Sequence, residues 1–196
     1  MTAPPFKWTA REIARSLYLQ AFNMKHLVLL PNCYFPGSEC DLLVVRNDLR
    51  MMEVEIKISR SDLKADATKD KWFDRPTRWD YGRERPAGLP LTHPKRIWKH
   101  YYCMPHELWK DDLAECIQPT SGIILMREFG SKPYCHIHRQ AKAAKLCDKI
   151  DLGDLCQLAR IATDRMWRAF DEVDSFRRQQ ELDAAKKRER EQSAIA

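Results

Sequence analysis

Alternating apolar and polar residues predict a β-hairpin in the first third of the chain. The apolar run 41–45 indicates a buried strand, and the polar segment 46–50 indicates a turn. Segment 51–58 then alternates with a period of two, which is typical of a strand. One predicted face carries Met52, Val54, Ile56 and Ile58, and the other carries Glu53, Glu55 and Lys57.

Further elements lie on both sides of this hairpin. Thr9 and Glu12 fit a capping box, so a helix is expected to begin there. A short strand over 26–30 is expected to end at Pro31, and a helix capped by Ser59 or Ser61 to run to about Phe73. The remaining expectations are strands over 97–104, 122–126 and 133–138, a helical turn over 106–113, and helix from 140 almost to the end with a break at 148–153.

This order of elements predicts an α/β fold of the α+β sandwich kind, with a mixed β-sheet flanked by helices. We expect a core over 1–139 that contains a basic insert at about 75–96. Residues 140–196 are expected to form a long C-terminal helical extension.

Composition narrows the class of protein. Among the 196 residues 44% are hydrophobic, which is typical of a globular chain, and no apolar run approaches the roughly 20 residues of a membrane span. The N-terminus lacks the layout of a signal peptide, so we expect a cytoplasmic protein without membrane contact. The seven cysteines are scattered and odd in number, which favours free thiols over disulfides.

The net charge of +6 is concentrated in one segment. Residues 57–100 contain twelve Lys and Arg against six Asp and Glu, so this segment carries the whole excess. Concentrated positive charge favours a phosphate backbone as partner, although a solvated basic loop would look the same. The candidate nucleic-acid contacts are Arg60, Lys64, Lys69, Lys71, Arg75, Arg78, Arg83 and Arg85.

Asp41, Glu55 and Lys57 form the candidate catalytic group. If strands 41–45 and 51–58 pair, Asp41 faces the region of Glu55, and Lys57 lies on the same face about 6.6 Å further along. Two carboxylates can hold Mg²⁺ or Mn²⁺ against a phosphate, and a lysine can orient water or stabilise charge. The alternative without chemistry is a half-exposed strand with cross-strand ion pairs. Glu53 is either a second acidic residue of the site or a solvated side chain.

The same residues resemble a known family. Segments 40–45 (CDLLVV) and 53–66 (EVEIKISRSDLKAD) are similar to the core of the PD-(D/E)XK nuclease superfamily, in particular to small MmcB-like DNA-repair nucleases and related phage and bacterial proteins. Segments 100–105 (HYYCMP) and 122–126 (GIILM) are similar to later strands of that core. Cys40 stands where the superfamily name has Pro, and the resemblance lapses in the basic insert and in the C-terminal third.

The resemblance implies a restriction-endonuclease-like core and a metal-dependent nuclease acting on DNA rather than RNA, in repair, recombination or phage genome processing. It implies Mg²⁺ or Mn²⁺ held by Asp41, Glu55 and the backbone carbonyl of Ile56, with Lys57 as the catalytic lysine. Glu12 and Asp62 match auxiliary acids. The alternative that the resemblance leaves open is an inactive nucleic-acid-binding or assembly protein on the same fold.

Other motifs have competing interpretations. The segment 135–138 (CHIH) lacks a second ligand pair at zinc-site spacing, so an edge strand with exposed imidazoles is favoured. The aromatic residues of the basic segment, among them Trp72 and Phe73, either stack on bases or anchor a loop. The C-terminal helix is a candidate for homodimerisation, nucleic-acid contact or another protein contact, and the alternative for its polar tail is a solvated end.

Overall fold

A computed structural model describes residues 8–22, 25–35, 37–74, 88–130 and 132–195, and for 189–195 it describes the backbone only. The chain divides into two units, Met1–Asp151 and Leu152–Ala196. The first unit contains the sheet and the shorter helices. The second is a single helix, α3 (Leu152–Ile195).

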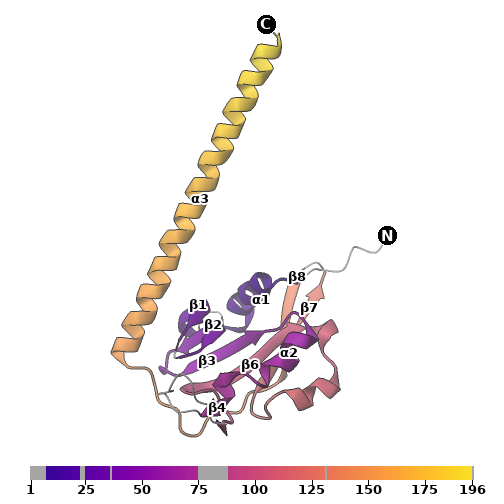
Figure 1. The fold of residues 1–196 in the computed structure, drawn as a ribbon, viewed down its shortest axis with the longest axis vertical. Helices are drawn as coiled ribbons and strands as arrows, with labels where there is room; N and C mark the ends of the chain where they lie inside the picture. The colour runs from indigo at the N-terminus through magenta and orange to yellow at the C-terminus, as the bar shows by residue number, and fades with distance from the viewer. Residues whose placement is uncertain (1–7, 23–24, 36, 75–87, 131, 196) are drawn as a thin grey trace, which may run out of the picture. The chain divides into compact units, whose positions relative to one another are not determined.

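The first unit is built on a mixed six-stranded sheet with the strand order β1-β2-β3-β6-β7-β8 (Figure 1). The first three strands form an antiparallel meander. Strand β6 pairs in parallel with β3, β7 pairs in parallel with β6, and β8 is an edge strand antiparallel to β7. The bounds are β1 (His26–Tyr34), β2 (Glu39–Arg46), β3 (Met51–Ile56), β6 (Ile97–Pro105), β7 (Gly122–Phe129) and β8 (Lys132–Arg139). A second, two-stranded sheet pairs β4 (Phe73–Asp74) with β5 (Leu89–Pro90).

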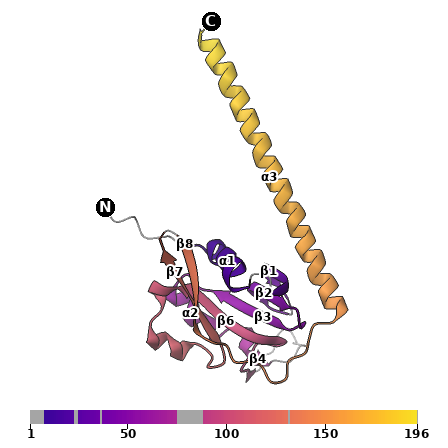
Figure 2. The same cartoon turned by 180° about the vertical axis from the view of Figure 1, so that it is seen from behind.

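Helices lie on both faces of the six-stranded sheet (Figures 1 and 2). On one face Ile13 and Leu17, from α1 and the π-helical turn η1, pack with Leu42 and Val54 of the hairpin. On the other face Leu63 of α2 packs in the cluster that contains Tyr102 of β6. The helical bounds are α1 (Ala10–Ser16), η1 (Leu17–Ala21), α2 (Arg60–Asp66), η2 (Asp70–Trp72), η3 (His106–Leu108) and η4 (Asp111–Cys116). The predicted α+β class with a mixed sheet, flanking helices and a long C-terminal helix is therefore confirmed.

Strands β1 and β3 end at other residues than expected. Strand β1 does not end at Pro31 but continues to Tyr34, with Pro31 opposite Leu42 and Cys33 opposite Cys40. Strand β1 is at the edge of the sheet, where proline is tolerated better than in a central strand. Strand β3 ends at Ile56 rather than at residue 58, and Ile58 is half exposed.

Two predicted helical segments are shorter. Helix α2 begins at the expected cap, Ser59, but ends at Asp66 instead of near Phe73. The segment 140–151 is not helical, although it is rich in Ala and Lys. Its backbone forms hydrogen bonds with other segments of the chain. The N–H groups of Lys142, Ala144 and Ile150 donate to the carbonyls of Thr120, Trp98 and Leu49, respectively. Tertiary hydrogen bonds thus override local helix propensity there.

Several other expectations can be compared directly. The capping box of Thr9 and Glu12 is present, and β8 is an edge strand as predicted from 133–138. The seven cysteines are free thiols. Of the basic insert at about 75–96, residues 75–87 lie outside the described part of the chain. Within the described residues, no helix has the length and apolar character needed to cross a membrane.

Candidate active site

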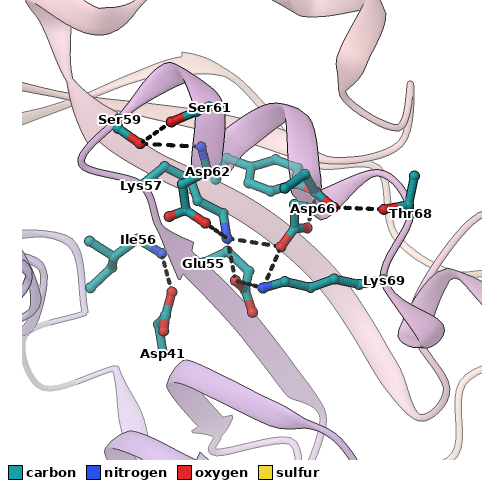
Figure 3. Close-up of polar contacts among 12 residues, drawn as sticks. Asp41, Glu55, Ile56, Lys57, Ser59, Ser61, Asp62, Asp66, Thr68 and Lys69 are labelled. Carbon is teal, nitrogen blue, oxygen red and sulfur yellow. Dashed lines mark hydrogen bonds and ion pairs between the residues drawn. The ribbon is translucent and has the colours of Figure 1, made fainter.

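The β2–β3 hairpin places Asp41 beside the end of β3. Leu42 pairs with Val54, so Asp41 comes opposite the Glu55–Ile56 region. Its Oδ2 accepts a hydrogen bond of 2.8 Å from the backbone N–H of Ile56, which Figure 3 shows at the lower left. The predicted proximity of Asp41 and Glu55 therefore follows from strand register, as expected.

Lys57 is the centre of a buried ionic cluster. The chain still follows β6 at this residue, because its backbone N–H donates to the carbonyl of Cys103 at 2.9 Å. The ammonium donates to Glu55 Oε2 and to Asp66 Oδ1, each at 2.8 Å, and lies 3.8 Å from Asp62 Oδ1. The Lys57 side chain is only 2% exposed. Figure 3 shows these three carboxylates converging on its nitrogen.

Asp66 is a part of the site that the sequence analysis missed. Its carboxylate is fully buried and accepts from four side chains. These donors are Lys57 and Lys69 on Oδ1, and Tyr102 (2.6 Å) and Trp72 (3.3 Å) on Oδ2. The signal was in the spacing, since Asp66 follows the buried Leu63 by three residues and so shares the inward face of α2.

Glu53 and Glu55 share one further lysine. Lys71 Nζ lies 2.9 Å from Glu53 Oε1 and 2.8 Å from Glu55 Oε1. All three side chains are less than 5% exposed. Glu53 is therefore a member of the buried cluster and not a solvated residue, and Lys71 lies inside the cluster, which corrects its predicted place among the surface contacts to nucleic acid.

Opposing effects set the pKa values at the centre of the cluster. Burial favours the neutral form of Glu55, but the ammonium groups of Lys71 and Lys57 outweigh it and lower the pKa of Glu55 to about 2. Burial also opposes charge on Lys57, yet Glu55 and Asp66 raise its pKa above the ordinary value. The pKa of Asp66 falls well below its usual range, because the effect of Lys71 and the bonds from Lys57 and Lys69 exceed its burial penalty. These groups are charged at neutral pH.

Two other carboxyl groups behave differently. Complete burial raises the pKa of Glu53 to about 8, against the attraction of Lys71, so Glu53 is mainly protonated at neutral pH. Burial and the negative charge of Glu55 raise the pKa of Asp41, although the bond from Ile56 N–H opposes this. Glu55 is thus paired with ammonium groups, whereas the hydrogen bond of Asp41 comes from the Ile56 N–H.

His100 is a buried residue of β6 that pairs with Glu53 of β3 in the strand register. Its Nδ1 is 2.9 Å from the Ser121 hydroxyl, and its ring makes edge-on contacts with Trp72 and Tyr102. Burial and the nearby ammonium of Lys71 hold the pKa of His100 well below its ordinary value, so the ring is neutral. Among the described residues, neither its Nε2 nor Glu53 Oε2 has a hydrogen-bond partner.

The metal-binding set expected from the sequence is Asp41, Glu55 and the Ile56 carbonyl. Asp41 and Glu55 supply carboxylate oxygens, and the peptide of Ile56 adjoins both. Mg²⁺ is commonly held by one or two carboxylates, with water and phosphate completing its shell. Within the described ranges no group of three or more His, Cys, Asp or Glu side chains has a metal-holding arrangement, and both oxygens of Glu55 already face ammonium groups. A cation would have to share or displace them.

The remaining predicted residues fall into three groups. Glu12 bonds to Thr9 at its own helix end, and Arg60 ties α2 to the carbonyls of Leu108 and Glu107. Lys64 is exposed, and Lys69 is 47% exposed at the rim of the cluster, where it contacts Asp66 and Glu55. The predicted contacts Arg75, Arg78, Arg83 and Arg85 lie outside the described residues.

Comparisons with known proteins add little to this geometry. No protein-family model matches the sequence, and no curated protein is significantly similar to it. Among solved structures, the chain is similar to SPO1766, a protein of unknown function from Silicibacter pomeroyi. The two share 18% sequence identity over 80% of this chain and 88% of that one, with a TM-score of 0.49.

Proposed function

We propose that this protein is a nuclease that hydrolyses phosphodiester bonds in DNA with the help of Mg²⁺ or Mn²⁺. One observation carries the proposal. Two carboxylates from opposite arms of a hairpin, Asp41 and Glu55, adjoin a buried lysine that donates directly to one of them. The resemblance of 40–45 and 53–66 to PD-(D/E)XK nucleases implies the same three residues.

Each residue has a chemical task in this proposal. Asp41, Glu55 and the Ile56 carbonyl would hold the cation, which would offset the negative charge that develops on the phosphate during attack. Lys57 is a cation fixed by Glu55 and Asp66, so it is suited to orient water and stabilise charge rather than to accept a proton. Asp66 acts through Lys57 and is a positioning residue.

Residues at the edge of the site are accessible to solvent, so a substrate could reach it. Glu55 and Lys57 are almost fully buried, but Asp41 is half-buried, and Asp62 and Lys69 are 46% and 47% exposed. A hollow of about 350 Å³ borders the cluster at Lys71. It is lined by Tyr34, Gly37, Ser38, Asp70, Lys71, Phe73 and Lys95. A phosphate-bearing strand could approach the cluster along this side, next to the half-exposed Lys69.

The decisive experiment compares cleavage of DNA and RNA substrates by the wild type and Asp41→Asn, with Mg²⁺, Mn²⁺ or EDTA. An asparagine can still accept the Ile56 N–H through its amide oxygen, so the hairpin is kept while the charge is removed. We expect DNA cleavage by the wild type with either metal, and no cleavage by Asp41→Asn or in EDTA. Glu128→Gln is the matched control, because Glu128 is an exposed carboxylate on β7 outside the cluster, and it should retain activity.

A binding protein on the same fold is the second candidate. It is favoured by the ammonium groups on both oxygens of Glu55, since an ionic network of this kind needs no metal. Calorimetry with Mn²⁺ separates the two. Heat of binding in the wild type that disappears in Asp41→Asn supports the nuclease, whereas no Mn²⁺ binding together with intact DNA binding would support the non-catalytic protein.

A further inference from the structure

The face of the sheet opposite the ionic cluster carries a pocket of about 450 Å³. Neighbouring strand residues project to opposite faces, so Met52 and Tyr101 face this pocket while Glu53 and Tyr102 face the cluster. The pocket also lies near the other end of β2, at Arg46. Its lining residues are Ala21, Phe22, Lys25, Arg46, Asn47, Met52, Lys99, Tyr101, Ile124, Ile137 and Gln140.

Three cationic side chains line the pocket. Lys25 precedes β1, Arg46 ends β2 and Lys99 lies on β6, and no carboxylate is among the lining residues. Trp98 fixes two of them, because the Arg46 guanidinium and the Lys99 ammonium lie 4.7 and 4.8 Å from its ring centre. Arg46 also contacts Asp48 at 3.3 Å, but both side chains are more than a third exposed, so that pair neutralises it only weakly. The pocket therefore favours an anion.

The floor of the same pocket is apolar. Phe22, Met52 and Ile124 are each at most 8% exposed and belong to the core on this face. Tyr101 forms one wall and donates its hydroxyl to Gln140 Oε1 at 3.0 Å, which turns the Gln140 amide nitrogen into the available donor. Gly122 lets this ring lie flat, because a Cβ at residue 122 would come within 2.3 Å of it.

We propose that this pocket binds a nucleoside monophosphate unit. The phosphate would pair with Arg46, Lys99 and Lys25, and the planar base would lie on the apolar floor. The side-chain amides of Asn47 and Gln140 offer donors and acceptors for the edge of the base. The combination of an apolar floor, a few polar groups and a volume of a few hundred Å³ is typical of small-molecule sites. The unit is either a free nucleotide or the 5′-terminal nucleotide of a strand.

This inference is independent of the proposed nuclease. The two sites lie on opposite faces of the sheet and share no residue. Binding in the pocket should therefore persist in Asp41→Asn and in EDTA. Loss of cleavage in that variant would test the nuclease alone, and a failure of nucleotide binding would leave the nuclease untouched.

Calorimetry in EDTA with AMP, adenosine and inorganic phosphate tests the pocket. We expect AMP to bind more tightly than either of its parts, because it alone uses both the cations and the floor. Arg46→Gln and Lys99→Gln should each weaken AMP binding roughly tenfold, the effect of losing one charged hydrogen bond. Lys110→Gln, an exposed lysine outside the pocket lining, is the matched control and should leave AMP binding unchanged.

A pair of short oligonucleotides with and without a 5′-phosphate separates the two sources of the ligand. A preference for the phosphorylated strand that disappears in Arg46→Gln would identify a strand end, and binding of AMP alone would identify a free nucleotide. Absence of binding by every probe, or AMP affinity that is equal in the wild type, Arg46→Gln and Lys99→Gln, would overturn the proposal. Thermal melting of each variant confirms that the comparison is made between folded proteins.

Discussion

The Asp66 carboxylate lies 2.8 Å from the Lys57 ammonium and is fully buried, whereas Asp62, one helical turn earlier, lies 3.8 Å away and is 46% exposed. Two aspartates on one short helix thus contact the same lysine in very different surroundings. Burial strengthens the first contact and exposure screens the second. Asp66, which lies outside the catalytic group expected from sequence, sets the position of Lys57 together with Glu55.

Replacing Asp66 by Asn should therefore be costly, and replacing Asp62 by Asn should not. Asp66→Asn leaves Lys57 without one buried partner, so we expect a loss of about 3 to 5 kcal/mol in the free energy of unfolding. Asp62→Asn should change it by less than about 1 kcal/mol. In cleavage assays of folded protein, Asp66→Asn should lower kcat more than it changes KM, because it moves Lys57 and not the substrate contacts. Equal effects of the two variants would contradict this role.

Lys57 itself needs a double-mutant design. From sequence, Lys57→Ala is expected to abolish cleavage and leave the fold intact, but the structure places Glu55 and Asp66 against this buried ammonium. Removal of Lys57 alone should destabilise the fold by about 3 to 5 kcal/mol. Lys57→Met combined with Glu55→Gln removes one charge of each sign. Chemical denaturation should show the double variant to be less destabilised than the sum of the single ones, by about 1 to 3 kcal/mol; strict additivity would argue against direct coupling.

The hairpin could be predicted from sequence because its pattern is local. The alternation of 51–58 determines which residues share a face, and a short turn brings Asp41 beside Glu55. Both conclusions depend only on strand period and chain length. The strand order, with β6 beside β3, and the burial of Glu53 depend on contacts between distant segments, which periodicity does not contain.

The members of the cluster that were missed illustrate the same limit. Tyr102 contacts Asp66 across 36 positions of sequence, and nothing local distinguishes its hydroxyl from that of Tyr101, which faces the other side. Charge composition places Lys71 among the exposed basic residues, because it does not show which way a side chain points. The helix expected from residue 140 failed for a related reason, since its backbone groups find partners in segments far away along the chain.

DNA binding should weaken steeply with salt, because phosphate contacts release counterions. Lys64 is exposed on α2, so Lys64→Gln should weaken binding for every sequence and reduce the slope of log K against log salt by roughly one unit. Fluorescence anisotropy with labelled duplex DNA at several salt concentrations measures this slope. Lys132→Gln, on the edge strand β8, provides a matched exposed control and should leave the slope unchanged. A flat salt response of the wild type would contradict phosphate contacts.

The homodimer expected from sequence has a candidate surface on α3. Four apolar side chains spaced along one stripe of this helix are 46–65% exposed: Met166, Phe170, Val173 and Phe176. A second copy of the helix could cover these four apolar side chains. We expect a dimer by light scattering after gel filtration, and a monomer for Val173→Asp. Ser175→Asp, on the opposite side of the helix, should remain dimeric, and a monomeric wild type would refute the expectation.

Glu53 should give the protein an unusual dependence of stability on pH. Burial raises its pKa to about 8 in the folded protein, whereas the unfolded chain has an ordinary pKa near 4.5. Between these values the folded state binds more protons than the unfolded state, so this residue's contribution to stability is full below about pH 4.5 and is lost as pH rises through 8. Glu53→Gln mimics the protonated form, so urea denaturation across pH 5 to 9 should show a smaller decline for this variant than for the wild type. Parallel profiles of the two proteins would show that Glu53 is already ionised in the folded state, held so by Lys71.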